Sequence, residues 1–316
     1  MTGSTATTAL VFPGQGCQRP AMARDFAEAF TEARLAFTEA SDATGIDLAR
    51  ICFEQDPRLE LTEFQQPAIL TAEIAMLRSL QAHFGLSAAW FGGHSLGEYT
   101  ALVAAGVIDL GRAAAVVKER GRLMQKAVAP GAGAMVAVLS GSGKALSEGP
   151  LRSCCNGLEV DVANLNSPEQ IVVSGSTGDV DEAVRRMRDC SGLLRVRFRK
   201  LAVSAPFHCR LMAVVDQELR RVLEAESWAS QRAATVVSNY TGTFHTTDVQ
   251  DLIAALLGQA SATVRWSDNM HELAAVADSI VEVGPGRPLR RFFASLGVKI
   301  TSIRDVRSAE ATFGRV

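Results

Sequence analysis

The chain has 316 residues, of which 47% are hydrophobic and 21% are charged, and its formal net charge at pH 7 is −2. This composition is ordinary for a soluble globular protein, and the length suffices for one large domain or two. The nearly balanced charge gives no overall attraction to nucleic acid or to an anionic membrane, so neither is expected as a partner.

The N-terminal part of the sequence alternates short apolar runs with segments that carry apolar residues at helical spacing. A strand is predicted at 9–12, before Pro13-Gly14, and a helix at 67–84, which stops at Gly85. The alternation continues with an apolar run and two further helices, at 88–91, 97–107 and 110–127. This order is typical of an α/β fold with a mainly parallel sheet.

A different order of elements follows the Gly- and Pro-rich stretch at 130–133. We predict strand, helix, strand, strand, helix and strand at 134–139, 144–153, 160–164, 170–174, 179–190 and 194–198. This is the β-α-β-β-α-β order of a ferredoxin-like unit, and we interpret it as an insertion whose ends return to the parent domain. The predicted division is a small subdomain at 130–200 and a large subdomain made of 1–129 and 201–316.

The parent domain is expected to resume after the insertion. Helices are predicted at 209–226, 248–259 and 267–277, and strands at 235–238, 279–283 and 298–303.

The cysteines and the start of the chain bear on its location. Its six cysteines show no paired C-x-x-C spacing, which favours reduced thiols over a disulfide framework or a metal site. The first ten residues contain no basic residue and no apolar targeting segment, and no run approaches the length of a membrane span. We therefore predict a cytoplasmic protein without a bound metal.

The sequence Gly93-His94-Ser95-Leu96-Gly97 follows the apolar run at 88–91. A serine between two glycines at a strand end is typical of a nucleophile elbow, in which the chain turns sharply into a helix and exposes the serine hydroxyl. Ser95 is therefore the candidate nucleophile. A G-x-S-x-G motif also arises by chance, so further observations are needed.

A serine hydroxyl near neutral pH needs a base within hydrogen-bond reach, and the usual partner is histidine. The chain has five histidines. His94 would point away from its neighbour Ser95 on the turn, and His83, His245 and His271 are more often surface or packing residues. His208, where a predicted strand meets a loop before a helix, is the best candidate.

Six sequence blocks resemble the malonyl-CoA:acyl carrier protein transacylases in order and spacing, from Leu10 to beyond Gly286. They are 12–18 (FPGQGCQ), 93–99 (GHSLGEY), 120–124 (RGRLM), 164–168 (NLNSP), 207–209 (FHC) and 282–286 (EVGPG). The resemblance implies a hydrolase-like α/β domain with a ferredoxin-like small subdomain inserted in it.

The resemblance also implies roles for particular residues. Ser95 matches the acylated nucleophile of the family and His208 its general base, while the backbone N–H groups of Gln15 and Leu96 match its oxyanion hole. In this family a backbone carbonyl orients the histidine, and by spacing back from Trp266 this carbonyl belongs to Gln259. Its alignment is the weakest of the set, because residues 260–263 depart from the family sequence.

Arg120 bears on the substrate class. In its helical context it could be a solvated surface residue, but an inward-pointing guanidinium could hold a carboxylate by two parallel hydrogen bonds. It matches the family arginine that binds the free carboxylate of malonate. Phe207 and Leu96 resemble the residues that accompany malonyl rather than methylmalonyl in related polyketide acyltransferases, although a phenylalanine before the histidine also suits a plain core position.

The resemblance implies transfer of a malonyl group from malonyl-CoA to the phosphopantetheine thiol of acyl carrier protein, for fatty acid or polyketide synthesis. Coenzyme A would enter as part of the thioester substrate, and no bound cofactor is expected. Three alternatives remain: a hydrolase that clears acyl groups from carrier proteins, a transacylase for another acyl group, and a non-catalytic carrier-binding protein.

Overall fold

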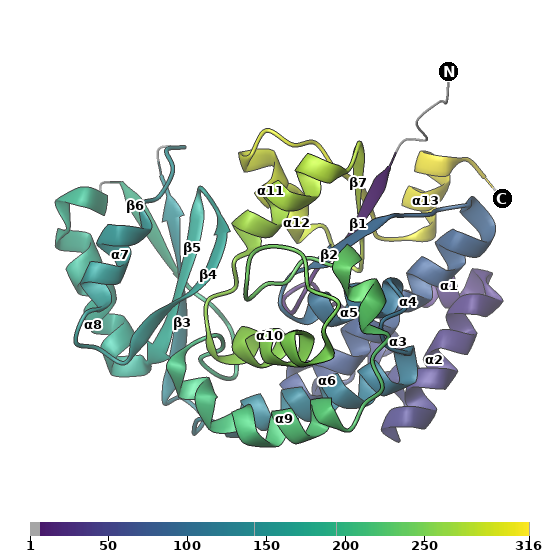
Figure 1. The fold of residues 1–316 in the computed structure, drawn as a ribbon, viewed down its shortest axis with the longest axis horizontal. Helices are drawn as coiled ribbons and strands as arrows, with labels where there is room; N and C mark the ends of the chain where they lie inside the picture. Colours follow the sequence, from purple (N-terminus) through teal and green to yellow (C-terminus); the bar gives the residue numbers. More distant parts are fainter. Residues whose placement is uncertain (1–6, 142, 194, 316) are drawn as a thin grey trace.

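Two four-stranded sheets organise the residues that the structure describes, which are 7–141, 143–193 and 195–315 (Figure 1). In this computed structural model the first sheet has the order β2-β1-β7-β8, and every neighbouring pair is parallel. Its strands are β1 (Thr8–Phe12), β2 (Trp90–Gly93), β7 (Ser279–Val283) and β8 (Thr301–Ile303). The predicted α/β fold with a parallel sheet is confirmed.

Strand β1 is buried on both faces. Leu10 and Phe12 pack into the main hydrophobic core, whereas Ala9 and Val11 pack on the opposite face, in a cluster that includes Trp266. Successive side chains of a strand point to opposite faces, so a strand covered on both sides needs an unbroken apolar run. This is why the apolar run at 9–12 forms an interior strand of the sheet.

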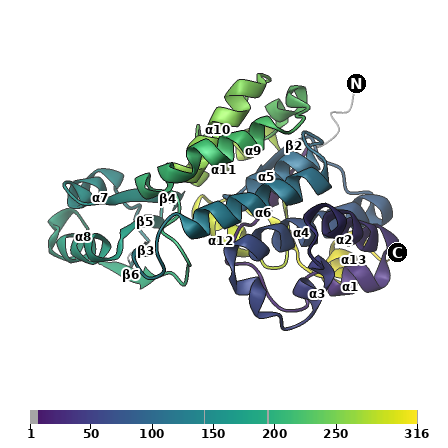
Figure 2. The ribbon, with the colours of Figure 1, turned by 90° about the horizontal axis from the view of Figure 1, so that it is seen from below.

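Helices cover both faces of the parallel sheet (Figures 1 and 2). They are α1 (Arg24–Ala29), α2 (Thr31–Thr44), α3 (Leu48–Phe53), α4 (Thr62–Phe84), α5 (Leu96–Ala104), α6 (Leu110–Lys126), α9 (Asp216–Glu224), α10 (Val249–Ser261), α11 (Trp266–Val276), α12 (Pro288–Ser295) and α13 (Val306–Phe313). Short 3-10 helices lie at η1 (Pro57–Glu60), η2 (Ser191–Leu193), η3 (Arg210–Val215) and η4 (Ser230–Thr235). Helix α4 contacts α2, α5 and α6 and is buried along most of its length.

The second sheet is antiparallel and has the order β4-β5-β3-β6. Its strands are β3 (Gly133–Ser140), β4 (Val160–Ser167), β5 (Gln170–Ser176) and β6 (Val196–Lys200). Helices α7 (Glu148–Cys155) and α8 (Thr177–Asp189) lie together on one face of it (Figure 1). The predicted ferredoxin-like unit is confirmed.

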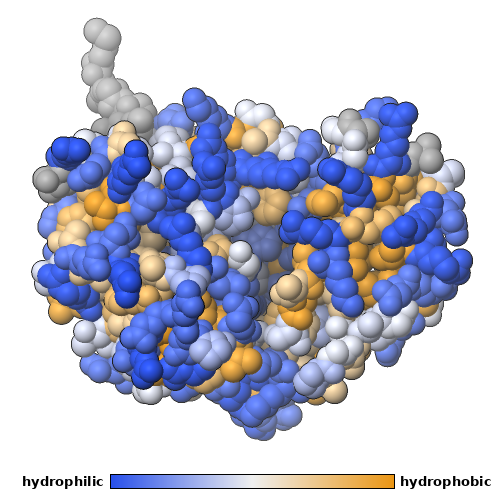
Figure 3. Space-filling model, turned by 180° about the vertical axis from the view of Figure 1, so that it is seen from behind, coloured by the Kyte–Doolittle hydropathy of each residue, from blue (hydrophilic) through white to orange (hydrophobic). Residues whose placement is uncertain are grey.

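The other face of the small sheet packs on the rest of the molecule. Along β3, Val136 and Val138 face α7 and α8, whereas Met135 and Ala137 belong to the main core. The surface is hollowed between the part with the small sheet and the part with the large sheet (Figure 3). The boundaries given above for the two subdomains remain a prediction.

Two predicted helices begin less regularly or later in the structure than expected. The helix predicted from residue 144 begins at Glu148, since the N–H of Leu146 is bound to the carbonyl of Pro168 and Pro150 is tolerated only in a first turn. The helix predicted at 209–226 is divided into η3 and α9, with 3-10 hydrogen bonds over its first turns.

Two predicted strands are also shorter than expected. Residues 235–238 form only single bridges, from Val236 to Phe91 and from Val237 to Phe244, because the N–H of Ser238 is taken up by a local turn. The strand predicted at 298–303 is limited to β8. The predicted start of the last inserted strand, Leu194, lies outside the described residues. None of the helices in the described ranges is both long and apolar enough to cross a lipid bilayer.

Candidate active site

Ser95 lies at a sharp turn between β2 and α5. Its backbone has φ 54° and ψ −104°, an unfavourable conformation for a residue with a side chain. A Cβ atom at Gly93 would come within 1.9 Å of the Gly97 carbonyl oxygen, and one at Gly97 within 2.2 Å of the Phe12 carbonyl oxygen. Both flanking glycines are therefore required by close backbone approach, as the elbow interpretation predicts.

Asn239 holds the backbone on both sides of this turn. Its Oδ1 accepts a hydrogen bond from the Ser95 N–H at 2.6 Å, and its Nδ2 donates to the Gly93 carbonyl at 2.8 Å. Asn239 is fully buried. It therefore supplies partners for backbone groups that the turn withdraws from regular secondary structure.

His208 lies against the Ser95 hydroxyl. Its Nε2 is 2.8 Å from Ser95 Oγ, and its Nδ1 is 2.7 Å from the carbonyl oxygen of Gln259. Because a carbonyl oxygen can only accept, Nδ1 carries the proton, and in the neutral ring Nε2 is then the acceptor for the serine O–H. The structure thus connects Ser95, His208 and the Gln259 carbonyl by two consecutive hydrogen bonds.

The surroundings of His208 favour its neutral form. Burial, together with the positive charge of Arg120, lowers the pKa of His208 from 6.5 to about 3, and the hydrogen bond to Gln259 opposes this only in part. Only 4% of the residue is exposed. At neutral pH the ring is therefore an unprotonated base next to a hydroxyl.

This pKa predicts how acylation depends on pH where Ser95 is the nucleophile expected from the sequence. With the pKa of His208 near 3, the rate should stay flat from pH 8 down to pH 5, whereas a base of pKa 6.5 would lose about 30-fold by pH 5. Rapid-quench measurement of the acylation rate across this range tests it, with circular dichroism as the control for folding.

The same pKa affects stability. Below pH 6.5 the histidine is protonated in the unfolded chain but stays neutral in the folded protein, so His208 lowers the free energy of unfolding progressively as the pH falls toward 3.

Arg120 points inward from α6 and is fully buried, which excludes the solvated alternative. Its Nη1 donates to Gln66 Oε1 at 2.7 Å and its Nη2 to Gln259 Oε1 at 2.8 Å, and Nη2 is 3.4 Å from Ser95 Oγ. A Cβ atom at Gly121 would lie 2.5 Å from the Thr62 carbonyl oxygen, so glycine allows α6 to approach α4 here.

The charge of Arg120 has no acidic partner among the described residues at ion-pair distance. Its contacts are neutral amide oxygens and the ring of Tyr99, 5.4 Å from the guanidinium carbon. Its Nε is buried and has no hydrogen-bond partner in the described part of the chain. A buried cation held this way can accept a carboxylate beside the serine.

The loop after β1 lies against the elbow. A Cβ atom at Gly14 would be 2.3 Å from the His94 carbonyl oxygen and 3.6 Å from the Leu96 nitrogen. The side chain of the next residue, Gln15, donates from Nε2 to Gln65 Oε1 at 2.6 Å. Leu96 is the first residue of α5, and first-turn N–H groups have no partner within their own helix. The loop that carries Gln15 and the first residue of α5, Leu96, therefore both lie beside the elbow.

The other predicted residues lie as follows. Phe207 is buried in the main core next to His208. His94 turns away from Ser95, with Nε2 2.6 Å from Asn166 Oδ1, as predicted. His245, expected at the surface or in packing, is buried, with Nε2 2.8 Å from Glu98 Oε1.

Sequence reasoning missed three buried polar residues that surround the site: Gln66, Glu98 and Asn239. The signal was present for Glu98, because a polar residue within an apolar helical run needs a partner when buried, and Glu98 stands in such a run on α5. Gln66 follows Gln65 just before the predicted helix start at Pro67, so the pattern did not mark it. Asn239 follows a segment that was predicted as a strand, so nothing marked it.

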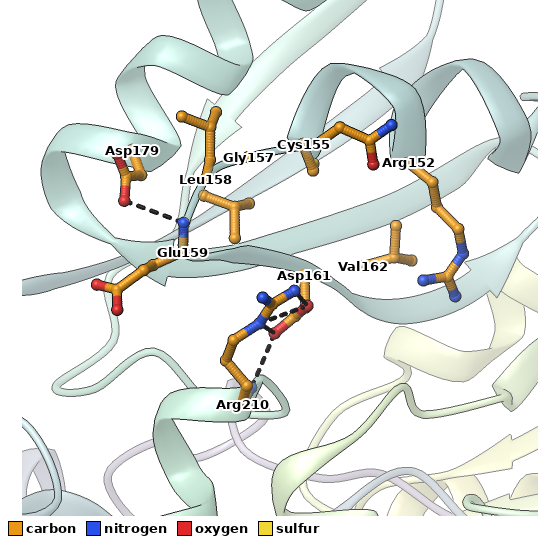
Figure 4. A pocket seen from close by; sticks show the side chains of 11 residues that line it. Arg152, Cys155, Gly157, Leu158, Glu159, Asp161, Val162, Asp179 and Arg210 are labelled. Carbon is orange, nitrogen blue, oxygen red and sulfur yellow. Dashed lines mark hydrogen bonds and ion pairs between the residues drawn. The ribbon is translucent and has the colours of Figure 1, made fainter.

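A cavity of about 530 Å³ lies elsewhere, on the small sheet between α7, β4 and η3 (Figure 4). Its charged side chains include Arg210, whose Nε is 3.0 Å from Asp161 Oδ2. None of the lining residues is Ser95, His208 or Arg120. Within the described residues, no group of three or more His, Cys, Asp or Glu side chains is placed to hold a metal ion.

Comparison with known proteins identifies the family. A profile of the acyl transferase domain matches residues 9–290. The chain belongs to the acyl transferase family. It is 37% identical to the malonyl CoA-acyl carrier protein transacylase of Escherichia coli O157:H7 over 288 residues, 89% of this chain and 90% of that one. The Bacillus subtilis (strain 168) protein of the same name is 34% identical, covering 93% of this chain and 92% of its own.

Solved structures agree with this assignment. The malonyl CoA-acyl carrier protein transacylase from Clostridium perfringens is similar with a TM-score of 0.88 at 33% identity, over 97% of this chain and 96% of that one. A malonyl-transacylase in complex with its type II PKS acyl-carrier protein has a TM-score of 0.88 at 33% identity, over 98% and 99% of the two chains. The family predicted from the sequence and its enzyme class, acyltransferase, are confirmed.

Proposed function

We propose that this acyltransferase moves a malonyl group from malonyl-CoA to the phosphopantetheine thiol of an acyl carrier protein, through a malonyl ester of Ser95. The observation that carries the proposal is the buried Arg120, which reaches Ser95 and whose hydrogen-bond partners among the described residues are all neutral oxygens. A free carboxylate on the acyl group would supply the missing anion. The names of the relatives point to the same donor and acceptor.

The first half of the reaction acylates the serine. His208 Nε2 takes the proton of the Ser95 hydroxyl while the oxygen attacks the thioester carbonyl, and the N–H groups of Gln15 and Leu96 stabilise the oxyanion. The Gln259 carbonyl keeps the imidazole oriented and stabilises the imidazolium as it forms. The imidazolium then returns the proton to the departing thiolate of coenzyme A, and the malonyl ester remains.

The second half runs in reverse. The carrier thiol gives its proton to His208 and attacks the ester carbonyl, and the Ser95 oxygen leaves and is reprotonated. The proposal assigns acyl discrimination to Phe207 and Leu96, with malonyl preferred over a branched extender. It also includes the division of the chain into a small subdomain at 130–200 and a large subdomain at 1–129 and 201–316, which contains Ser95 and His208. The proposed location is the cytoplasm.

The testing experiment follows the mass of the intact protein. Mixing with malonyl-CoA should add one malonyl group, and adding a carrier protein that bears phosphopantetheine should move this group to the carrier. Coenzyme A release, measured in parallel with a thiol reagent, should match the adduct in amount.

Other outcomes separate the remaining alternatives. Malonate released into solution, with the carrier left unloaded, would support the hydrolase. An adduct formed from an uncharged acyl donor but not from malonyl-CoA would support a transacylase for another acyl group. No adduct from any donor would support a non-catalytic carrier-binding protein.

A further inference from the structure

A buried carboxylate lies behind the catalytic pair. Glu98, on the first turn of α5, is fully buried, and its Oε1 is 2.8 Å from Nε2 of His245, whose side chain is 1% exposed. Its Oε2 accepts two hydrogen bonds, from the Asn239 N–H at 3.1 Å and from Gln259 Nε2 at 2.8 Å. Glu98 is thus one hydrogen bond away from two residues that contact the catalytic pair.

Gln259 forms the first connection. Its side-chain Nε2 donates to Glu98 Oε2 and to the Ser95 carbonyl, while its Oε1 accepts from Arg120 Nη2. The Gln259 amide lies between the Glu98 carboxylate and the Arg120 guanidinium. Only the orientation with its NH₂ group toward Glu98 and its oxygen toward Arg120 satisfies both. The backbone carbonyl of the same residue holds His208 Nδ1. Glu98 therefore holds the residue that orients both the base and the guanidinium.

Asn239 forms the second connection. Its N–H is bound to Glu98, and its side chain holds the Ser95 N–H and the Gly93 carbonyl. Ser95 has an unfavourable backbone conformation, so its orientation depends on such external partners. Displacing Asn239 would release the elbow, even though Asn239 lies outside the reacting groups.

We infer that Glu98 and His245 form a buried anchor that positions Ser95, His208 and Arg120 together, by way of Asn239 and Gln259. Both are positioning residues, since neither contacts Ser95 Oγ or the His208 ring. The inference rests on the proposed roles of Ser95 and His208. It predicts that weakening the anchor impairs catalysis and carboxylate recognition at the same time.

The first test compares two buried glutamates. Glu98→Gln replaces one carboxylate oxygen with an amide group that cannot accept, so the acylation rate with malonyl-CoA should fall about tenfold or more. The control, Glu73→Gln, changes a carboxyl on α4 that accepts from Thr100, and burial raises the pKa of Glu73 well above its usual range. An amide keeps an acceptor oxygen for Thr100 without the charge that burial disfavours, so the control should retain nearly wild-type rates.

The second test changes His245. It keeps the inference testable if the Glu98→Gln variant fails to fold. His245→Gln can place a donor near the original Nε2, whereas His245→Leu cannot, so the glutamine variant should keep most of the activity and the leucine variant should lose about tenfold. Each variant is assayed with malonyl-CoA and acetyl-CoA. We expect kcat to fall for both donors, and the malonyl-to-acetyl preference to fall as well, because Arg120 loses its position.

The outcomes separate this inference from the proposed function. If the wild-type protein forms no malonyl adduct on Ser95, the proposed function fails. If the adduct forms and Glu98→Gln and His245→Leu react like Glu73→Gln, only the anchor is refuted. An equal loss of thermal stability in Glu98→Gln and Glu73→Gln, with loss of activity in the first alone, supports positioning over a merely structural role.

Discussion

Replacing Ser95 with alanine should abolish formation of the acyl-enzyme, with a loss of transfer on the order of 10⁴-fold or more. In the proposed mechanism the acyl group is attached to this hydroxyl oxygen, and His208 Nε2 has no other hydroxyl within hydrogen-bond distance among the described residues. Alanine has the same Cβ atom as serine and adds no further steric restriction to the backbone, so the elbow should remain folded. Intact-mass measurement after mixing with malonyl-CoA gives the result directly.

Ser79→Ala provides the matched control. Ser79 is a buried serine of α4 whose hydroxyl donates to the Ala75 carbonyl at 2.9 Å, within its own helix. This variant should acquire the malonyl group like the wild-type protein. A malonyl adduct that persists in Ser95→Ala would place the nucleophile on another residue.

The parallel sheet and the elbow could be predicted because local sequence decides them. The run at 9–12 is apolar at every position, which suits a strand covered on both faces, and Gly93 and Gly97 are needed wherever a strand turns into a tightly packed helix. The small sheet was predictable from the order of its elements, and its first strand, β3, is an unbroken apolar run at 134–139.

Errors arose where distant contacts decide the structure. The segment at 235–238 has strand composition, but only Val236 and Val237 form bridges, because Ser238 and Asn239 bind a turn, the elbow and Glu98. Helix α4 begins at Thr62, five residues before the predicted start at Pro67, although proline usually marks the first turn. Tertiary contacts override local preference at both places.

The candidate site divides in the same way. The elbow motif led to Ser95, comparison of the five histidines led to His208, and family resemblance led to the role of Arg120; the structure brings these side chains together. The residues that hold them are Asn239 and Glu98. The apolar context of Glu98 signals that it has a buried partner, but the partners of both residues could not be assigned from sequence, because they lie more than 140 positions away along the chain. Such long-range hydrogen bonds leave no periodic pattern to detect.

Arg120→Ala should reduce malonyl transfer about 10- to 100-fold more than acetyl transfer. A charge-assisted hydrogen bond to a carboxylate contributes about 1.5–3 kcal/mol, and malonyl transfer would lose this contribution. Acetyl-CoA has no free carboxylate, so its transfer does not depend on this bond. Acetyl transfer should also change, though less, because the variant removes a positive charge that lowers the pKa of His208 and so affects both donors. The ratio of kcat/KM for the two donors, measured in both proteins, gives the discrimination.

Two further variants isolate the cause. Arg120→Lys keeps the positive charge but loses the planar fork that bonds Gln66 and Gln259 together, so its preference for malonyl should be intermediate. Arg122→Ala, on the solvent side of the same helix and paired there with Glu119, should behave like the wild-type protein. Equal losses of malonyl and acetyl transfer in Arg120→Ala would mean that Arg120 only supports the site, and the carboxylate would have to be recognised by another group.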